Sequence, residues 1–464
     1  FGGFMMTKDW SGRRVLIVGV ARQGTALARY LVDHGAEVVL NDRGTASDLL
    51  DAQDELADLD VEWVLGGHPL SVLDDVDLVC PSGGVPLTVP LIREARARGM
   101  HLSNDSQFFL EAAPCPVIGI TGSAGKTTTT MLVGRMAEAG TDAQTWVGGN
   151  IGNPLIANVD KMAQDDLAVV EFSSFQLELM AASPQVAAVL NVTPNHLDRH
   201  GTMAAYTAAK RSILEFQSAS DVAILGREDP GAWALAPAVQ GELISFGFGR
   251  PARGSQGTFL QDGWIKFWDG ESSQPMLTTD LIILRGEHNL LNVLAACAVA
   301  MGAGLPVEAM RVGVNGFEGA PHRLEFVRSW GGADWYNDSI ATAPERAMAA
   351  IRSFDEPLIL LAGGRDKDLP WDEFADLVRQ RVDHLIIFGE ASAKVKAAVE
   401  GAGPGERPCS VSVCEGLAEA VEEAANVVAP GDVVLLSPGG TSFDQFEDFA
   451  ERGRWYRKWV NELA

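Results

Sequence analysis

The stretch GITGSAGKTTTTMLVGRM, residues 119–136, combines a glycine-rich turn with one lysine and four consecutive threonines. Taking Gly119 as the first glycine, we interpret it as the phosphate-loop pattern G-x-x-x-x-G-K-[ST], in which Thr127 follows Lys126. The apolar run CPVIGI, residues 115–120, precedes the turn, and apolar residues at helical spacing follow it. The order strand, turn, helix therefore predicts a nucleotide site and disfavours the alternative, a plain glycine-rich turn.

In such a loop the backbone N–H groups and the helix N-terminus bind phosphate, and the lysine reaches the β- and γ-phosphates. The hydroxyl of the following threonine ligates Mg²⁺. The predicted phosphate site consists of Gly122, Gly125, Lys126, Thr127 and Thr128.

Two polar residues follow later apolar runs in the same part of the chain. Glu171 ends the run DLAVVE, and His196 follows VAAVLNV. Because the carboxyl ends of parallel strands meet at one edge of a sheet, both are expected near the phosphate loop. Glu171 is a candidate ligand of Mg²⁺ beside Thr127, with a solvated carboxylate as the alternative. A structural role is the alternative for His196 and the expectation for His200.

The length and charge of the chain limit its function. With 464 residues the chain exceeds one ordinary core and predicts about three domains. It has 62 Asp and Glu against 36 Lys and Arg, a formal charge of −26, which argues against binding nucleic acid or anionic membranes through the surface as a whole. An anionic substrate would need a local basic pocket.

The cysteines and the first residues indicate the cellular compartment of the protein. The five cysteines show no CxxC spacing, which argues against a disulfide framework or a zinc ribbon and favours a reducing cytoplasm; they are Cys80, Cys115, Cys297, Cys409 and Cys414. No apolar run is long enough to cross a bilayer, and the first ten residues lack the pattern of a signal peptide. We interpret the residues before Met5 or Met6 as an addition to the natural sequence.

The first predicted domain, residues 1–114, alternates apolar runs with helical patterns, which indicates a parallel sheet. The turn GVARQG, residues 19–24, follows the first strand, and Asp42 ends the second, as in a dinucleotide-binding fold. The complete G-x-G-x-x-G pattern is missing, so NAD is poorly supported and a purely structural turn remains an alternative.

The second predicted domain, residues 115–319, carries the phosphate loop, and the third, residues 320–464, again alternates strands with helices, as in PLILLAGG and DVVLLSPGG. The predicted fold class is α/β with three domains. These are a Rossmann-like N-terminal domain, a P-loop ATPase-like central domain and a Rossmann-like C-terminal domain.

A series of motifs follows in one order along the chain: GSAGKTTTT, GGNIGNP, EFSSFQLE, NVTPNHLDRHGT, YTAAKRSI, GEHNLLN, PHRLEF, NDSIATAP, LAGGRDKD and LLSPGGTSFDQFEDFAERG. Together they resemble the Mur ligases, in particular the branch that adds D-glutamate to UDP-N-acetylmuramoyl-L-alanine, over essentially the whole chain. The resemblance implies a cytoplasmic, monomeric enzyme that forms an amide with ATP and two Mg²⁺ ions through an acyl phosphate in peptidoglycan precursor synthesis. Its domains would bind the UDP-sugar, ATP and the amino acid, with no nucleic acid or membrane as partner.

The resemblance also implies a role for each matching residue. Lys126, His196 and Lys210 would be catalytic, and Thr127, Glu171, His196 and Lys210 would hold the metal ions, with His196 at the second. Lys210 of YTAAKRSI would carry a carbamate, which turns a cation into an anionic ligand and which bicarbonate and mildly alkaline pH should favour. Without the resemblance Lys210 is expected to be a solvated helix lysine.

The remaining implied residues fall into three sets. ATP would be bound by the phosphate loop together with Asn292, Arg323 and Asp338. The UDP-sugar would be bound by Gln23, Gly24, Asp42, Arg43, Gly83, Asn150 and His196. The amino acid would be bound by Thr342, Lys367, Ser442 and Phe449.

Several of these residues have structural alternatives on the bare sequence. Asn292 could be a helix-capping amide, Asp338 a turn-forming residue, Lys367 a solvated loop lysine and Ser442 a helix N-cap. The chain also departs from the family pattern at two positions. Ala124 replaces an asparagine, with a mild expected effect, and Ile340 replaces a lysine that enzymes of this type often carry near the substrate junction.

Three other functions compete with D-glutamate addition. One is a ligase of the same family that adds L-glutamate or another amino acid, and another is a ligase similar to folylpolyglutamate synthase. The third is a phosphate-loop switch that hydrolyses nucleotide only to change conformation. The motifs LAGGRDKD and SPGGTSFDQF count against the switch, because a switch needs no third ligand domain.

Overall fold

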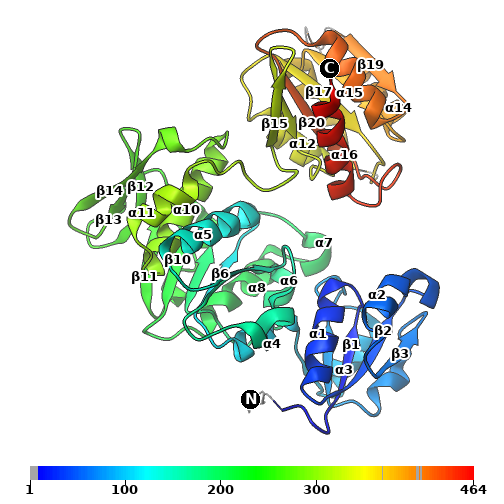
Figure 1. Ribbon diagram of the computed structural model, residues 1–464, viewed down its shortest axis with the longest axis vertical. Helices are drawn as coiled ribbons and strands as arrows, with labels where there is room; N and C mark the ends of the chain where they lie inside the picture. The colour runs from blue at the N-terminus through cyan, green and yellow to red at the C-terminus, as the bar shows by residue number, and fades with distance from the viewer. Residues whose placement is uncertain (1–8, 368, 404–406, 408–409) are drawn as a thin grey trace. The chain divides into compact units, whose positions relative to one another are not determined.

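The computed structural model describes residues 9–367, 369–403, 407 and 410–464. The residues before Met5 and Cys409, both named above, lie outside these ranges. The chain divides into two compact units. Figure 1 labels their helices and strands. One comprises the residues up to Ile282 together with His288–Gly316, and the other comprises Ile283–Glu287 and Phe317–Ala464.

The first unit begins with a five-stranded parallel sheet in the order β3-β2-β1-β4-β5. The strand order reverses between β1 and β4, and in such sheets ligands bind beyond the carboxyl ends of the strands at this point. The elements are β1 (Arg14–Val18), α1 (Arg22–Asp33), β2 (Glu37–Asp42), η1 (Ala46–Leu49), α2 (Leu50–Glu55), β3 (Val61–Leu65), η2 (Leu70–Leu73), β4 (Leu78–Pro81), α3 (Pro90–Ala97), β5 (His101–Leu102) and α4 (Asp105–Ala112).

A nine-stranded sheet follows in the order β14-β13-β12-β11-β10-β9-β6-β8-β7. It is parallel from β7 to β12, whereas β13 and β14 are antiparallel. Its strands are β6 (Val117–Thr121), β7 (Thr145–Gly149), β8 (Leu167–Glu171), β9 (Val186–Val189), β10 (Val222–Gly226), β11 (Glu242–Phe246), β12 (Gln256–Gln261), β13 (Trp264–Trp268) and β14 (Ser273–Thr278). Its helices are α5 (Lys126–Gly140), η3 (Leu155–Lys161), α6 (Ser174–Leu177), α7 (Leu197–His200), α8 (Met203–Glu215), α9 (Pro230–Trp233), η4 (Ala236–Ala238), η5 (Thr279–Leu281), α10 (Glu287–Gly302) and α11 (Val307–Val314).

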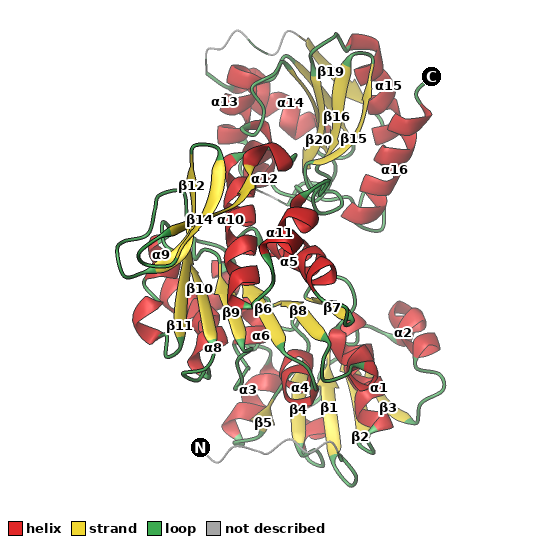
Figure 2. Cartoon of the chain, turned by 60° about the vertical axis from the view of Figure 1, so that its left-hand side comes forward, coloured by secondary structure: helices red, strands yellow, loops and turns green. Residues whose placement is uncertain are grey.

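The second unit holds a six-stranded sheet in the order β15-β16-β20-β17-β18-β19, in which only the edge strand β15 is antiparallel. Figure 2 shows helices on both faces of this sheet. The elements are β15 (Glu325–Trp330), β16 (Ala333–Asn337), α12 (Pro344–Ile351), β17 (Leu358–Gly363), α13 (Asp372–Arg381), β18 (His384–Phe388), α14 (Ser392–Gly401), β19 (Ser410–Cys414), α15 (Leu417–Val427), β20 (Val433–Gly439) and α16 (Phe449–Glu462).

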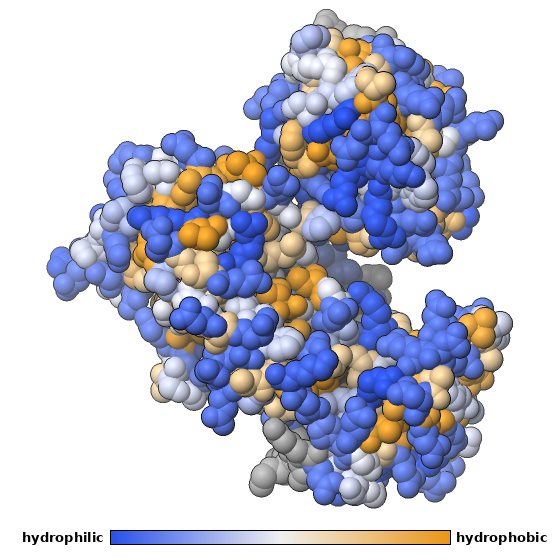
Figure 3. Space-filling model, viewed as in Figure 1, coloured by the Kyte–Doolittle hydropathy of each residue, from blue (hydrophilic) through white to orange (hydrophobic). Residues whose placement is uncertain are grey.

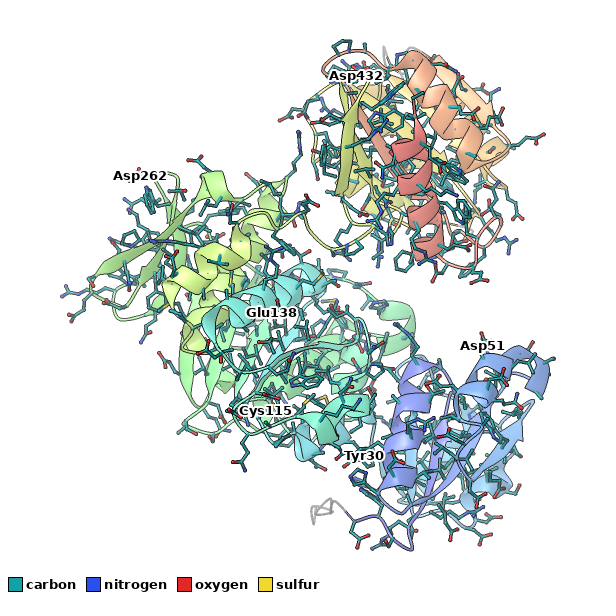
Figure 4. The ribbon with its side chains drawn as sticks, viewed as in Figure 1. Tyr30, Asp51, Cys115, Glu138, Asp262 and Asp432 are labelled. Atoms are coloured by element: carbon teal, nitrogen blue, oxygen red, sulfur yellow. The ribbon has the colours of Figure 1, made fainter. Side chains whose placement is uncertain are left out.

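Apolar packing explains why these runs fold as they do. In β17, Leu358 and Leu360 enter one core while Ile359 and Leu361 enter the other, so the strand reads as an unbroken apolar run, as expected when helices cover both faces of a parallel sheet. In the first unit, one apolar cluster includes residues of both sheets, among them Tyr30 on α1 and Cys115 before β6 (Figure 4). The two sheets of this unit are therefore held together by a shared core.

The predicted fold class is confirmed, since three α/β sheets follow one another in the predicted order; the bounds of the three domains stay a prediction. Hydrophilic residues cover most of the visible surface of each unit (Figure 3), in keeping with the many charged residues. Within the described ranges, the structure contains no helix whose length and apolar character would let it cross a membrane.

Candidate active site

The phosphate loop links β6 to α5 at the centre of the nine-stranded sheet. Gly125 caps α5 with a φ of +82°, a left-handed conformation that favours glycine. Asn191 holds the turn in place, because its carbonyl and its side-chain Oδ1 accept the N–H groups of Ser123 and Ala124 at 3.0 and 2.8 Å. Ala124 contributes through its backbone, which agrees with the mild effect expected for this departure from the family pattern.

The interpretation of Gly119 as the first glycine of the loop is wrong. Five residues, rather than four, separate it from Gly125, and it lies inside β6. A Cβ atom at Gly119 would stand 2.5 Å from Pro184 and 2.8 Å from Phe172, so glycine is needed there for close packing in the core. The turn itself begins at Gly122, where a Cβ atom would stand 2.9 Å from Leu190.

The side chains at the start of α5 meet the end of β8. Lys126 donates from Nζ to the carbonyl of Gly122 at 3.0 Å, and the Thr127 hydroxyl donates to Oε2 of Glu171 at 2.8 Å. The other carboxylate oxygen, Oε1, accepts from Nδ2 of Asn150 at 2.8 Å. Since β6 pairs with β8 in register, the sheet itself brings the predicted metal ligands Thr127 and Glu171 together.

Lys210 lies on α8 and is 1% exposed, so the solvated-lysine alternative is wrong. Its Nζ donates to Oγ1 of Thr121 at 3.4 Å and stands 4.8 Å from the ring centroid of Tyr206. Burial, and after it the positive charge of Lys126, lower the pKa of Lys210 to about 6, while the charge of Glu171 partly opposes the shift. The amine is therefore mostly neutral at pH 7 and lies at the base of the phosphate loop.

The two histidines of NHLDRHG differ in surroundings. His196 is exposed, precedes α7 with a φ of +53°, and has its ring edge-on to Phe175 with centroids 5.1 Å apart. His200 stacks on Phe175 and its Nε2 lies 2.9 Å from Oγ of Ser174, in line with the structural role expected for it. The predicted role of His196 as a metal and substrate ligand stays a prediction.

Thr127 and Glu171 are hard oxygen donors of the kind that bind Mg²⁺, and their 2.8 Å separation lets both face one ion. Over the described part of the chain, no group of three or more His, Cys, Asp or Glu side chains could hold a metal ion. A magnesium ion held by Thr127 and Glu171 would have room for ligands from phosphate oxygens and water, which Mg²⁺ commonly takes in nucleotide sites.

Asn292 lies inside α10, where its Nδ2 donates to Oδ1 of Asn289 at 3.1 Å, so the helix-capping alternative is wrong. A Cβ atom on Gly125 would stand 2.2 Å from Oδ1 of Asn292. The amide therefore abuts the phosphate loop, and the predicted contact of Asn292 with adenine stays a prediction.

In the second unit, Asp338 follows β16 and is buried. Its carboxylate accepts from Oγ of Ser437 at 2.8 Å and from the N–H of Leu324 at 3.2 Å. Burial raises the pKa of Asp338 to about 7, and the charges of Arg323 and Arg346 oppose that rise. These contacts join distant segments, so a turn-forming role does not account for Asp338.

The predicted amino-acid site also lies in the second unit. Lys367 donates from Nζ to Oγ1 of Thr342 at 3.4 Å. Its pKa is lowered by partial burial, and next by the charges of Arg346 and Arg452. Ser442 is buried and is not the N-cap of α16, which is Asp448, so that alternative is wrong. Phe449 is the first residue of α16, and its carbonyl accepts from Oγ of Ser339 at 2.7 Å.

A pocket of about 320 Å³ lies in the first unit between the turns after β1 and β4 and the ends of β7 and β8. Of the predicted UDP-sugar residues, Gln23, Gly83 and Asn150 line it. Gly24, Asp42, Arg43 and His196 are not among its lining residues. Asp42 accepts the N–H groups of Val20 and Gly44, both at 2.8 Å, Gly24 packs tightly against Gly19, and Arg43 is exposed. The predicted contacts of these residues with the UDP-sugar stay a prediction.

Three residues that line this pocket are not among the predicted site residues, although each lies in a motif quoted above: Arg22, Phe175 and Arg199. Arg22 donates to the carbonyl of Gly152 at 3.0 Å, and the guanidinium carbon of Arg199 stands 3.9 Å from the ring centroid of Phe175. The two arginines supply the local positive charge that an anionic substrate of an acidic protein needs. An arginine beside a phosphate-binding turn is the sequence signal that could have identified Arg22.

Comparison with known proteins gives matches along the whole chain. Residues 13–104 match the Mur ligase MurD-like N-terminal domain, residues 120–300 the Mur ligase middle domain, and residues 322–440 the Mur ligase glutamate ligase domain. The UDP-N-acetylmuramoylalanine--D-glutamate ligase of Symbiobacterium thermophilum is 42% identical over 454 residues, covering 97% of this chain and 98% of the relative. The enzyme of that name from Pelotomaculum thermopropionicum is 39% identical, with 99% of each chain covered.

Solved structures share the fold. UDP-N-acetylmuramate-alanine ligase MurC from Thermotoga maritima has a TM-score of 0.57 at 17% identity, covering 97% of this chain and 99% of that chain. The MurF ligase of Thermotoga maritima, solved in complex with ADP, has a TM-score of 0.56 at 17% identity and the same coverage. With three domain models matched in order and full-length relatives at 39–42% identity, the chain belongs to the Mur ligase family.

Proposed function

We propose that this chain is an ATP-dependent ligase that joins D-glutamate to UDP-N-acetylmuramoyl-L-alanine in peptidoglycan precursor synthesis. The observation that carries the proposal is the 42% identity over 97% of the chain to a ligase of that name. The geometry supports it, because the first unit holds a phosphate loop beside a cationic pocket and the second holds the Lys367–Thr342 pair.

The reaction needs a better leaving group than oxide. A carboxylate oxygen of the first substrate attacks the γ-phosphorus of ATP, ADP leaves, and an acyl phosphate forms. The amine of glutamate then attacks the acyl carbon, inorganic phosphate leaves, and the amine gives up a proton. Both steps gather negative charge, so the protein's main task is to hold cations and N–H donors where that charge accumulates.

This chain's residues divide that task. Lys126 and the N–H groups at the start of α5 would neutralise the transferred phosphoryl group, and Thr127 and Glu171 would hold Mg²⁺. When bound, Mg²⁺ polarises the phosphoryl oxygens. Asn150 keeps Glu171 oriented through its hydrogen bond. Arg323 and Asp338 would contact the nucleotide's phosphate and ribose, which stays a prediction.

The carbamate on Lys210 is part of the proposal. The neutral amine would attack the carbon of CO₂, forming an N–C bond while one C–O π bond breaks and one proton is released, so that a neutral amine becomes an anionic carbamate. Because the amine of Lys210 is already mostly neutral at pH 7, we expect carbamylation to depend only weakly on pH above 7. The resulting anion would stand near the positive charge of Lys126.

The test of the function is phosphate release from ATP across UDP-sugar peptides and amino acids. We expect release to require both UDP-N-acetylmuramoyl-L-alanine and glutamate, with D-glutamate preferred over L-glutamate. Replacing Lys367 by Ala should raise the KM for glutamate about tenfold or more, because a carboxylate loses its cation. Lys458→Ala, which removes an exposed lysine of α16, is the matched control.

Preference for L-glutamate would refute the stereochemical part of the proposal, and an unchanged KM in Lys367→Ala would refute the role of that lysine. Ile340 lies in the region that could affect the preference between D- and L-glutamate. It is half-buried and its N–H donates to the carbonyl of His322 at 3.1 Å, so an apolar side chain stands in the loop that contains Thr342. Phosphate release without an amino acid would favour the nucleotide switch instead.

The N-terminal sheet is expected to bind the uridine diphosphate group rather than a nicotinamide cofactor. Arg22 and Arg199 line its pocket, and phosphate oxygens pair well with guanidinium groups. Arg22→Ala should weaken UDP binding about tenfold in calorimetry. The control Arg93→Ala, at an exposed position of α3, should leave it unchanged. Tight NAD binding without UDP-sugar binding would reverse the assignment.

A further inference from the structure

Arg452 lies in the first turn of α16 and is 1% exposed. Its Nε donates to Oγ of Ser339 at 3.0 Å, and its Nη2 donates to the carbonyl of Ser339 at 2.8 Å. Both Nη atoms also donate to the carbonyl of Gly440 at 3.2 Å. Ser339 follows β16 and Gly440 follows β20, its parallel neighbour. One side chain thus ties together two loops at the carboxyl edge of the sheet.

A third loop passes over the same guanidinium. Gly364, which follows β17, has a φ of +91°, and a Cβ atom there would stand 2.2 Å from the carbonyl oxygen of Thr441 and 2.9 Å from Nη1 of Arg452, so this loop packs closely against the guanidinium. The three loops lead directly to Thr342, Ser442 and Lys367. Ser339, the partner of Arg452, also donates to the carbonyl of Phe449. Thr342, Ser442 and Phe449 therefore lie at or close to segments that Arg452 or Ser339 bonds, and Lys367 follows a loop that packs against Arg452.

Arg452 is a buried cation. Its three acceptors are neutral oxygens, and Asp444 attracts it only from a greater distance. Burial lowers the pKa of Arg452 to about 10, so the group still carries its charge at pH 7. A buried cation bonded only to neutral groups is costly, and a neutral amide could serve as a tie at lower cost. The retained charge calls for an anion nearby.

We propose that Arg452 is a positioning residue for the amino-acid site, tying together the loops after β16 and β20, packing against the loop after β17 and supplying positive potential beneath an amino acid with two carboxylates. The inference rests on the proposed function, because it takes glutamate as the ligand. It acts through Lys367, Thr342 and Ser442 rather than by touching the substrate. Its loss should therefore weaken binding of the amino acid and leave the sites for ATP and the UDP-sugar unchanged.

The test measures the KM for D-glutamate, ATP and UDP-N-acetylmuramoyl-L-alanine in the full chain. Arg452→Met removes both the charge and the hydrogen-bonding fork, and we expect its KM for D-glutamate to rise about tenfold or more. Arg452→Lys keeps the charge but cannot span both loops, so a rise of about threefold is expected. The other two KM values should stay within about twofold.

Arg328→Met is the matched control, because Arg328 also ties α16 to the sheet, donating to the carbonyls of Asn461 and Leu463 at the far end of that helix. We expect all three of its KM values to stay near those of the wild type. If Arg452→Met fails to fold by circular dichroism, Arg452→Lys and Ser339→Ala decide the question.

Two results would overturn the inference. One is an unchanged KM for D-glutamate in the folded variants, and the other is an equal rise in all three KM values. Failure of the proposed function is distinguishable from both, because it would appear as absent D-glutamate-dependent phosphate release in the wild type.

Discussion

Lys126→Ala is expected to lower ATP-dependent phosphate release by about a thousandfold or more. Lys126 opens α5 and its Nζ lies 3.0 Å from the carbonyl of Gly122, at the rim of the phosphate loop. Without Lys126 the transferred phosphoryl group loses its cation, because residues 122–128 contain no other Lys or Arg. Phosphate release with both co-substrates present, and trapping of the acyl phosphate by hydroxylamine, measure the effect.

Two comparisons make this result specific. Lys161→Ala removes an exposed lysine from η3 of the same unit and should leave turnover unchanged. Circular dichroism should show both variants folded, because neither lysine belongs to the apolar core. Turnover near the wild-type rate in Lys126→Ala would refute the assignment of residues 122–128 as the phosphate site.

Lys210→Ala is expected to lose at least about a hundredfold in activity and to regain part of it in the presence of acetate. The substitution leaves a small cavity beside Thr121 at the base of the phosphate loop, which a small carboxylate can enter. Acetate would then stand in for the anionic end of the carbamate. Activity titrated with acetate, with chloride at equal ionic strength as the reference, measures the rescue.

The variant Lys126→Ala serves as the control for the rescue of Lys210→Ala by acetate. Lys126→Ala should not respond to acetate, because it lacks a cation rather than an anion. In the wild type, carbamylation should fall as the pH drops below about 6, where the amine of Lys210 becomes protonated, and it should change little above pH 7. Mass spectrometry under gentle, bicarbonate-containing conditions that finds an unmodified Lys210 in fully active enzyme would rule the carbamate out.

The fold was predictable because its signals are local. The run VIGIT of β6 is entirely buried, and a glycine turn and the helical pattern of α5 follow it within the sequence, so each piece could be recognised without its neighbours. The meeting of Thr127 and Glu171 also followed from the sequence, since parallel strands bring their carboxyl ends to one edge. Gly119 was misread because a pattern of glycines does not distinguish a turn from a tightly packed strand.

For some residues the sequence did not decide between a structural and a functional role, because the answer depends on packing between distant segments. Whether Lys210 is solvated or buried depends on how α8 packs against β6, and whether Asp338 merely forms a turn depends on Ser437, ninety-nine residues later. The pocket residues Arg22 and Arg199 lie on the helices α1 and α7, far apart in the chain, so no local pattern relates them.

The sequence by itself therefore determined the α/β class, the order of its parts and the phosphate loop, because strand, turn and helix signals are carried by neighbouring residues. Only the tertiary structure decided the burial of Lys210, the cationic pocket and the contacts of Arg452, since burial and charge proximity arise when segments far apart in the chain are brought together. Solvent exposure is a property of the folded surroundings, and a side chain's own identity does not set it.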